Sequence, residues 1–150
     1  MNSFGSSCRE NKQELSAEEN LLIGVIGGSG LYQLPGLTIS KSVKTETPYG
    51  KPSGPISIGE LCGGRIAFLP RHGERHTIPP HKVPYKANLA ALKSLGVRHV
   101  IGTCVAGSLR KEIEPGTFVV LDQFINLTWG RDDTYDIDRE LVHLPMARPY

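Results

Sequence analysis

The chain has 150 residues, of which 39% are hydrophobic, and this is enough for one folded domain with an apolar core. Its 17 basic and 15 acidic side chains leave a formal net charge of +2, which excludes the strong basic bias of a general nucleic-acid or membrane-surface binder. No apolar run approaches the ~20 residues of a membrane span, and residues 1–20 lack the apolar middle of a signal peptide. The cysteines, Cys8, Cys62 and Cys104, form no paired motif, so we expect neither a zinc site nor a secreted disulfide framework. Together these features favour a reducing, cytoplasmic location.

The N-terminal part of the chain leads into a glycine-rich turn. We expect residues 1–20 to be a polar, mobile leader, although Ser16 and Glu19 also have the spacing of a helix capping box. An apolar run from Leu22 then predicts a buried strand, and it ends in Gly27-Gly28-Ser29-Gly30. Such a turn lets backbone amides and a serine hydroxyl approach an anion closely, but an isolated glycine cluster is more often a plain strand-to-loop connection.

The following segment has the pattern of a strand, a loop and a hairpin. Alternation from Ile39 to Thr45 predicts a strand with one solvated face. The prolines and glycines of residues 47–55 remove donors and break regular ladders, which predicts a loop. Two further apolar strands, Ile56 to Leu61 and Arg65 to Leu69, flank Cys62-Gly63-Gly64 with the spacing and turn chemistry of a hairpin.

A dense polar stretch, Arg71 to Lys82, directly follows the second hairpin strand, at the end where open α/β sheets bind ligands. A helix is predicted from about Tyr85 to Leu95, ended by Gly96. We expect its apolar face to consist of Leu89, Leu92 and Leu95.

The last third of the chain predicts two more strands. Residues 97–101 have the pattern of a buried strand in which His99 is packed, and the strand leads into small residues at 103–109. Pro115-Gly116 predicts a chain reversal, residues 118–121 a further strand, and residues 126–138 a polar loop. Several strands with one strong helix, including an antiparallel hairpin, predict an α/β fold with a mixed central β-sheet flanked by helices.

Three of these segments follow strands and carry chemistry that suits one small anion. If a single sheet brings them together, the Ser29 turn, the Arg71-His72 loop and the turn at 103–108 supply amides, a hydroxyl and a guanidinium, for which phosphate is the obvious ligand. Arg71 can bind such an anion through two N–H groups at once. His72 and His76 can add further donors near physiological pH.

The same residues have simpler interpretations that the sequence leaves open. Arg71 is compatible with a surface salt bridge, and Cys104 has no identifiable partner, which favours a packed thiol over a nucleophile. His72, His76 and His81 could form a metal set, but their proline-rich loop lacks the helical spacing of metal-binding motifs, so we predict no metal. The glycine turn also misses the spacing of a dinucleotide-binding fingerprint.

Six motifs in a fixed order carry a resemblance to a known family. They are Gly24 to Leu31, Thr47 to Ser53, Arg71 to Pro79, Val83 to Asn88, Gly107 to Leu109 and Asp122 to Ile125. Through them the chain resembles, from about Ile23 to Tyr150, the nucleoside phosphorylases that include S-methyl-5'-thioadenosine phosphorylase, within the trimeric purine nucleoside phosphorylase group. The resemblance implies that residues 21–150 are the N-terminal part of a single domain that is incomplete at its C-terminus.

The resemblance also implies a reaction. Phosphate displaces the purine of a nucleoside, most directly S-methyl-5'-thioadenosine, and yields the free base and (5-methylthio)ribose 1-phosphate, a step of purine and methionine salvage. An anion fixed beneath the sugar both attacks and stabilises the positive charge that develops there. Inorganic phosphate is then a co-substrate, and no cofactor is expected. The implied partners are the nucleoside, phosphate and further copies of the chain in a trimer or a hexamer, with no nucleic acid or membrane.

By the same resemblance, phosphate binding falls to five residues: Ser29, Arg71, His72, Cys104 and Val105. His76 is expected to touch the 5' end of the substrate or, in a trimer, a neighbouring subunit. Family members commonly have threonine and alanine where this chain has Cys104 and Val105, so one hydroxyl contact to phosphate is in doubt.

Family chains continue well past the position of Tyr150, and that part carries the acidic residue that recognises the base. The catalytic acid is therefore expected beyond Tyr150, and the choice between an adenine nucleoside and a 6-oxopurine nucleoside, including S-methyl-5'-thioinosine, stays open. Two other interpretations remain. One is a truncated, non-catalytic homologue that keeps the phosphate pocket, and the other is a nucleotide-binding module with dinucleotide affinity and no phosphate dependence.

Overall fold

The computed structural model describes residues 21–28, 30–31, 33–131, 134–135 and 144–150. The chain divides into two units, Met1–Val105 and Ala106–Tyr150. The assigned elements, all within the first unit, are β1 (Leu22–Gly27), β2 (Thr38–Val43), β3 (Ile56–Leu61), β4 (Gly64–Pro70), the short 3-10 helix η2 (Pro80–Lys82), α1 (Tyr85–Ser94) and β5 (His99–Gly102). The expected leader and capped helix in residues 1–20, and Ser29, lie outside the described residues. Neither of the helices in the described part is long and apolar enough to span a membrane.

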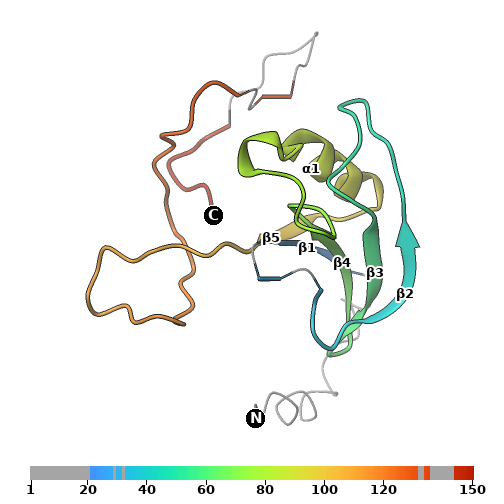
Figure 1. Cartoon of the computed structure of the whole chain (residues 1–150), viewed down its shortest axis with the longest axis horizontal. Coiled ribbons are helices and arrows are strands. Elements are labelled where there is room, and N and C mark those ends of the chain that lie inside the picture. Colours follow the sequence, from blue (N-terminus) through green and yellow to red (C-terminus); the bar gives the residue numbers. More distant parts are fainter. Residues whose placement is uncertain (1–20, 29, 32, 132–133, 136–143) are drawn as a thin grey trace. The chain divides into compact units, whose positions relative to one another are not determined.

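The strands form one mixed sheet in the order β2-β3-β4-β1-β5 (Figure 1). β1 pairs in parallel with β4 on one side and with β5 on the other. β3 pairs antiparallel with both β2 and β4. The predicted mixed sheet is therefore confirmed, and β1, the strand before the glycine turn, lies between two parallel neighbours.

The hairpin between β3 and β4 also agrees with the prediction. Its turn residues Cys62 and Gly63 have positive φ angles of 50° and 82°, the conformation of the two-residue turn whose twist matches that of paired strands. Glycine adopts this conformation without strain, whereas Cys62 carries a side chain there. Cys62 is disulfide-bonded, whereas the spacing of the cysteines predicted no disulfide framework.

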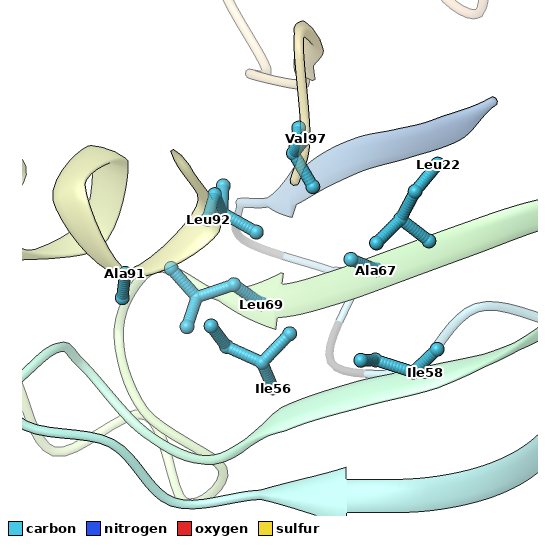
Figure 2. Packing of buried hydrophobic residues seen from close by; sticks show 8 residues of the cluster. All are labelled: Leu22, Ile56, Ile58, Ala67, Leu69, Ala91, Leu92 and Val97. Atoms are coloured by element: carbon cyan, nitrogen blue, oxygen red, sulfur yellow. The ribbon is translucent and has the colours of Figure 1, made fainter. Parts of the chain in front are cut away.

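One face of the sheet packs against α1. Leu22 of β1, Leu69 of β4 and Ile56 of β3 form a buried cluster with Leu92 of the helix, and Figure 2 shows these side chains together with Ile58, Ala67, Ala91 and Val97. Residues two apart in a strand share a face, and the members from β3 and β4 follow that spacing. Burial of this cluster holds the helix on the sheet.

The opposite face of the sheet has its own apolar cluster. Val25, Ile66 and Phe68 are buried there, and they point away from the α1 face because each is one residue out of phase with it. The partly buried residues packed on them come from β1, from the end of β3 and from the segment after the glycine turn: Ile23, Leu61, Leu31, Leu34 and Leu37. β1 and β4 are therefore covered on both faces.

The predicted helix is present, but its buried face differs from the expected one. The buried residues of α1 are Ala87, Asn88, Ala91 and Leu92, whereas Leu89 is 41% exposed. Small residues let the helix approach the sheet closely, and this moves the contact stripe away from Leu89. Gly96 follows the helix with a φ of 88°, as expected for a glycine that ends a helix.

β5 was predicted to be buried, and this prediction was wrong. All of its residues are exposed, with Val100 at 42% and Ile101 at 55%, and His99 is exposed rather than packed. The strand lies at the edge of the described sheet and pairs with β1 alone. Its apolar pattern correctly indicated a strand, but burial depends on neighbours that the pattern does not reveal.

The second unit contains the predicted turn but not the predicted strand. The amide of Thr117 donates to the carbonyl of Glu114 at 3.1 Å across Pro115-Gly116, which confirms the reversal. Residues 118–121 form no strand, and Phe118 is 98% exposed. A strand needs a hydrogen-bonded neighbour, and the described residues of this unit provide none for this segment.

Candidate functional site

Three strand ends meet at one edge of the sheet. β4, β1 and β5 run in parallel, so their carboxyl ends lie side by side (Figure 1). Beyond the strands, the Arg71 amide donates to the Gly27 carbonyl at 2.9 Å and the Thr103 amide donates to the Ile26 carbonyl at 3.0 Å. The sheet thus brings together the glycine turn, the Arg71-His72 loop and the segment at Thr103, as the strand pattern predicted.

Gly28 is the point of closest approach between these segments. Its amide donates to Thr103 Oγ1 at 3.2 Å, and that hydroxyl donates in turn to the Ile26 carbonyl at 3.3 Å. A Cβ atom at Gly28 would lie 2.6 Å from Arg71 Nη2 and 2.7 Å from the Thr103 carbonyl oxygen. The glycine is therefore required here because it leaves room for the guanidinium beside the end of β1.

Arg71 is half-buried, and two hydrogen bonds fix its guanidinium. Nη1 donates to the Thr103 carbonyl at 3.1 Å, and Nε donates to His72 Nε2 at 3.4 Å. Neither acceptor is a carboxylate, which disfavours the surface salt-bridge interpretation. A guanidinium has more N–H donors than these bonds use, and its positive charge is not cancelled by either partner. The arrangement suits an anion held at the end of the sheet.

His72 is 6% exposed and closes the loop that follows β4. Its Nδ1 lies 2.8 Å from the Ile78 carbonyl oxygen, while the Ile78 amide donates to the His72 carbonyl at 3.0 Å. His76 lies on the same loop, is exposed, and has a positive φ of 52°. The His72 and His76 rings are 4.7 Å apart between centroids, so the structure brings these two predicted site residues together.

The remaining predicted site residues follow Thr103 in the first unit. Cys104 is an exposed free thiol, so the expectation of a packed thiol was wrong. Val105 is 83% exposed. Both lie beyond the end of β5, whose place at the edge of the described sheet explains their exposure. Among the described residues, no group of three or more His, Cys, Asp or Glu side chains is placed to hold a metal ion.

Thr103 is the residue that the sequence interpretation missed. The turn at 103–109 was named, but phosphate binding was assigned to Cys104 and Val105. In the structure the Thr103 hydroxyl accepts a hydrogen bond from the Gly28 amide, and the Thr103 carbonyl accepts one from Arg71 Nη1. The available signal was its position as the first hydroxyl-bearing residue after β5, at the end where parallel strands place ligands.

A buried polar clamp supports the loop behind Arg71, and it too was missed. The Ser53 amide donates to Asn88 Oδ1 at 2.7 Å, and Asn88 Nδ2 donates to Ser53 Oγ at 2.9 Å. Asn88, on α1, is only 1% exposed. The Ser53 carbonyl oxygen lies 3.3 Å from where a Cβ of Gly73 would be. The clamp thereby fixes the loop of residues 47–55 against the loop that carries His72.

Comparison with known proteins identifies a matching family and similar proteins. The model of the phosphorylase superfamily matches residues 22–150. The S-methyl-5'-thioadenosine phosphorylase of Thermofilum pendens is 52% identical over 132 residues, which cover 88% of this chain and 50% of the relative. The protein of the same name from Mycolicibacterium smegmatis is 51% identical over 130 residues, 87% of this chain and 49% of the relative.

Solved structures are also similar to this chain. The methylthioadenosine phosphorylase from Schistosoma mansoni in complex with adenine superposes with a TM-score of 0.80 at 41% identity. The match covers 87% of this chain and 49% of that one. The chain thus spans about half the length of the curated relatives and of the solved structure that it matches.

Proposed function

Because the chain belongs to the phosphorylase superfamily, we propose that it carries the phosphate-binding part of a purine nucleoside phosphorylase. The reaction is the phosphorolysis of S-methyl-5'-thioadenosine to adenine and 5-methylthioribose 1-phosphate. One observation carries the proposal: the half-buried Arg71 guanidinium, which donates to an imidazole and a backbone carbonyl rather than to a carboxylate, lies where three parallel strands end. The names of the relatives support the choice of substrate.

In this proposal the protein contributes positioning and charge. A phosphate at the strand ends accepts hydrogen bonds from Arg71 and is aligned beneath C1' of the sugar. As the bond to the base breaks, positive charge develops on the ribose, and the aligned anion stabilises it and then forms the new C–O bond. The purine leaves with the electrons of the broken bond and is neutralised by a proton. The residue that supplies this proton is not assigned within these 150 residues.

The remaining residue roles are also proposals. Phosphate is bound by Arg71, His72, the pair Cys104-Val105 and Ser29, of which Ser29 lies outside the described residues. At Cys104 and Val105 the backbone makes the contact, because neither side chain supplies the hydroxyl common in the family. His76, exposed on the same loop, touches the 5' end of the substrate or a neighbouring subunit. No cofactor takes part, and inorganic phosphate is the co-substrate.

We also propose that the protein assembles as a homotrimer, or as a hexamer of two trimers, and that it acts in the cytoplasm. The assembly rests on the family resemblance, and sedimentation velocity tests it.

The location rests on the scattered cysteines. The disulfide at Cys62 favours an oxidising compartment instead. The test is therefore a count of free thiols in protein kept at cytosolic glutathione potential. Full reduction is the expected result, and a persistent disulfide contradicts the cytoplasmic location.

The decisive experiment separates binding from turnover. Phosphate binding to the chain is measured by calorimetry, and adenine release from methylthioadenosine is measured with and without phosphate. We expect phosphate to bind, and Arg71→Ala to lose about 2 to 4 kcal/mol of the binding free energy because a desolvated anion loses its charged donor. Arg75→Ala is the matched control, since Arg75 is an exposed arginine of the same loop.

The outcomes distinguish the alternatives. Phosphate-dependent adenine release supports the phosphorylase, and release of hypoxanthine from inosine or methylthioinosine in its place supports a 6-oxopurine enzyme. Phosphate binding without release of any base supports a non-catalytic homologue that keeps the phosphate pocket. An unchanged phosphate affinity in Arg71→Ala contradicts the site. Binding of NAD without phosphate dependence contradicts the phosphorylase altogether.

A further inference from the structure

The surroundings of the His72 ring determine which of its nitrogens carries the proton. Nδ1 lies 2.8 Å from the Ile78 carbonyl oxygen, which can only accept a hydrogen bond, so Nδ1 must be protonated. Nε2 lies 3.4 Å from Arg71 Nε, which can only donate, so Nε2 must present its lone pair. The ring is therefore a neutral imidazole whose polar atoms both have partners within the protein.

This tautomer makes His72 an acceptor aimed at the arginine. Arg71 Nε donates to the imidazole, and Nη1 donates to the Thr103 carbonyl at 3.1 Å. The guanidinium is planar, so two anchors on different nitrogens fix the orientation of its plane. A long arginine side chain otherwise loses substantial rotamer entropy when it binds a ligand.

From this geometry we propose that His72 contributes to phosphate binding through Arg71. Its imidazole is a positioning residue that orients the guanidinium toward phosphate and does not itself touch phosphate. The inference rests on the proposed phosphate site and deepens it. A carboxylate in the same place would also orient the arginine, but it would cancel the positive charge and repel the anion. A protonated imidazole would offer no acceptor and would repel the guanidinium. Neutral histidine orients the charge and leaves it available to the ligand.

The Ile78 carbonyl is the other half of this arrangement. Without a fixed acceptor at Nδ1, the ring could carry its proton on Nε2 and would then present a donor to a donor. The Ile78 amide bonds the His72 carbonyl at 3.0 Å, so the same residue pair also closes the loop. Burial of His72 to 6% exposure keeps water from replacing either partner.

The test compares two replacements of His72 by phosphate calorimetry. The amide of His72→Gln has an acceptor and a donor with a separation close to that of the two ring nitrogens, so affinity should stay within about threefold of the wild type. His72→Leu lacks both groups and should bind phosphate about tenfold more weakly. His81→Leu, at an exposed histidine in η2, is the control and should leave affinity unchanged. Thermal unfolding of each variant verifies that it is folded.

A double-mutant cycle separates positioning from a merely structural role. In an Arg71→Ala background, His72→Leu should cause no further loss of phosphate affinity, because its effect acts through the arginine. An additional loss of the same size in that background overturns the inference and shows that the ring acts on phosphate or on the fold directly. If the wild-type chain binds no phosphate, the proposed site fails and the inference with it. If it binds phosphate and His72→Leu binds equally well, only the inference fails.

Nitrogen-15 NMR of the histidine ring gives an independent readout without ligand. The His72 signals, identified by their loss in His72→Gln, should show a protonated Nδ1 and an unprotonated Nε2. A spectrum with a protonated Nε2 and an unprotonated Nδ1 would make the ring a donor toward Arg71, and the inference would be wrong. This measurement also keeps the inference testable if His72→Leu does not fold.

Discussion

Two apolar runs of equal length differ in burial and in secondary structure. Residues 66–69 of β4 are buried, with Ile66 at 8% exposure and Leu69 at 0%. Residues 118–121 of the second unit are 51% to 98% exposed and form no strand. Both runs have the composition of strands, yet only the first has hydrogen-bonded neighbours on both sides and apolar residues against both faces. A strand is thus a property of its surroundings as much as of its residues.

The site follows the same rule. Arg71 and Thr103 are polar residues just beyond strands, and they converge because the ladders of β4 and β5 with β1 bring them together. Ser108 also carries a hydroxyl, but in the second unit it bonds to a residue two positions along the chain, accepting from the Arg110 amide at 3.0 Å and donating to the Arg110 carbonyl at 2.9 Å. Long-range pairing distinguishes a constructed site from a polar loop.

The largest effect should come from truncating matched leucines in the two runs. Leu69→Ala removes a fully buried side chain from the cluster under α1 and should lower the free energy of unfolding by about 2 to 5 kcal/mol. Leu121→Ala, at a side chain 51% exposed, should change it by less than about 0.5 kcal/mol. Urea denaturation measures both. Comparable losses would show that the second run is buried in solution and would break the contrast.

A smaller effect is expected at two glycines. Gly28→Ala places a methyl group 2.7 Å from the Thr103 carbonyl oxygen and 2.6 Å from Arg71 Nη2, so unfolding free energy should fall by about 1 to 3 kcal/mol and phosphate affinity should fall with it. Gly107→Ala is the matched control in the second unit, because a methyl group there meets nothing within 4 Å. Thermal unfolding and phosphate calorimetry report the two effects. A Gly28→Ala variant with full stability and affinity would contradict the close approach.

The smallest effect concerns Glu112, an exposed residue of the second unit. A hydrogen bond from its own backbone and a second from Arg110 lower the pKa of its carboxyl group. Arg110→Ala should raise that pKa only part of the way back, because the backbone bond remains. NMR titration of the carboxyl group measures it, and a complete return to the ordinary pKa would contradict the order of the two causes.

The same group provides a pH test. A lowered folded-state pKa favours the folded form above the unfolded pKa, and the contribution is lost as pH falls through the folded value. Because the pair is exposed and screened by solvent, Arg110→Ala should leave stability unchanged within error at every pH. A measurable pH-dependent loss would indicate that this part of the second unit is packed in solution.

Much of the architecture was readable from the residues. Val25 and Ile26 before the glycine turn, the turn at Cys62-Gly63 and Gly96 after the helix act through local backbone preferences, and each led to a correct element. These signals are local because turn geometry and side-chain alternation depend on neighbours within a few residues. The polar residues after strands likewise identified the edge of the sheet where Arg71 lies.

By itself, then, the sequence determined the strands of the first unit, the helix α1 and the segments that form the site. Only the tertiary structure decided that Leu89 and β5 are exposed and that residues 118–121 pair with no strand in the described part of the chain. It also decided that Thr103 rather than its neighbours holds Arg71 in place. The physical reason is that exposure and hydrogen-bond partners depend on groups far apart in the chain, and strand pairing alone sets which of them meet.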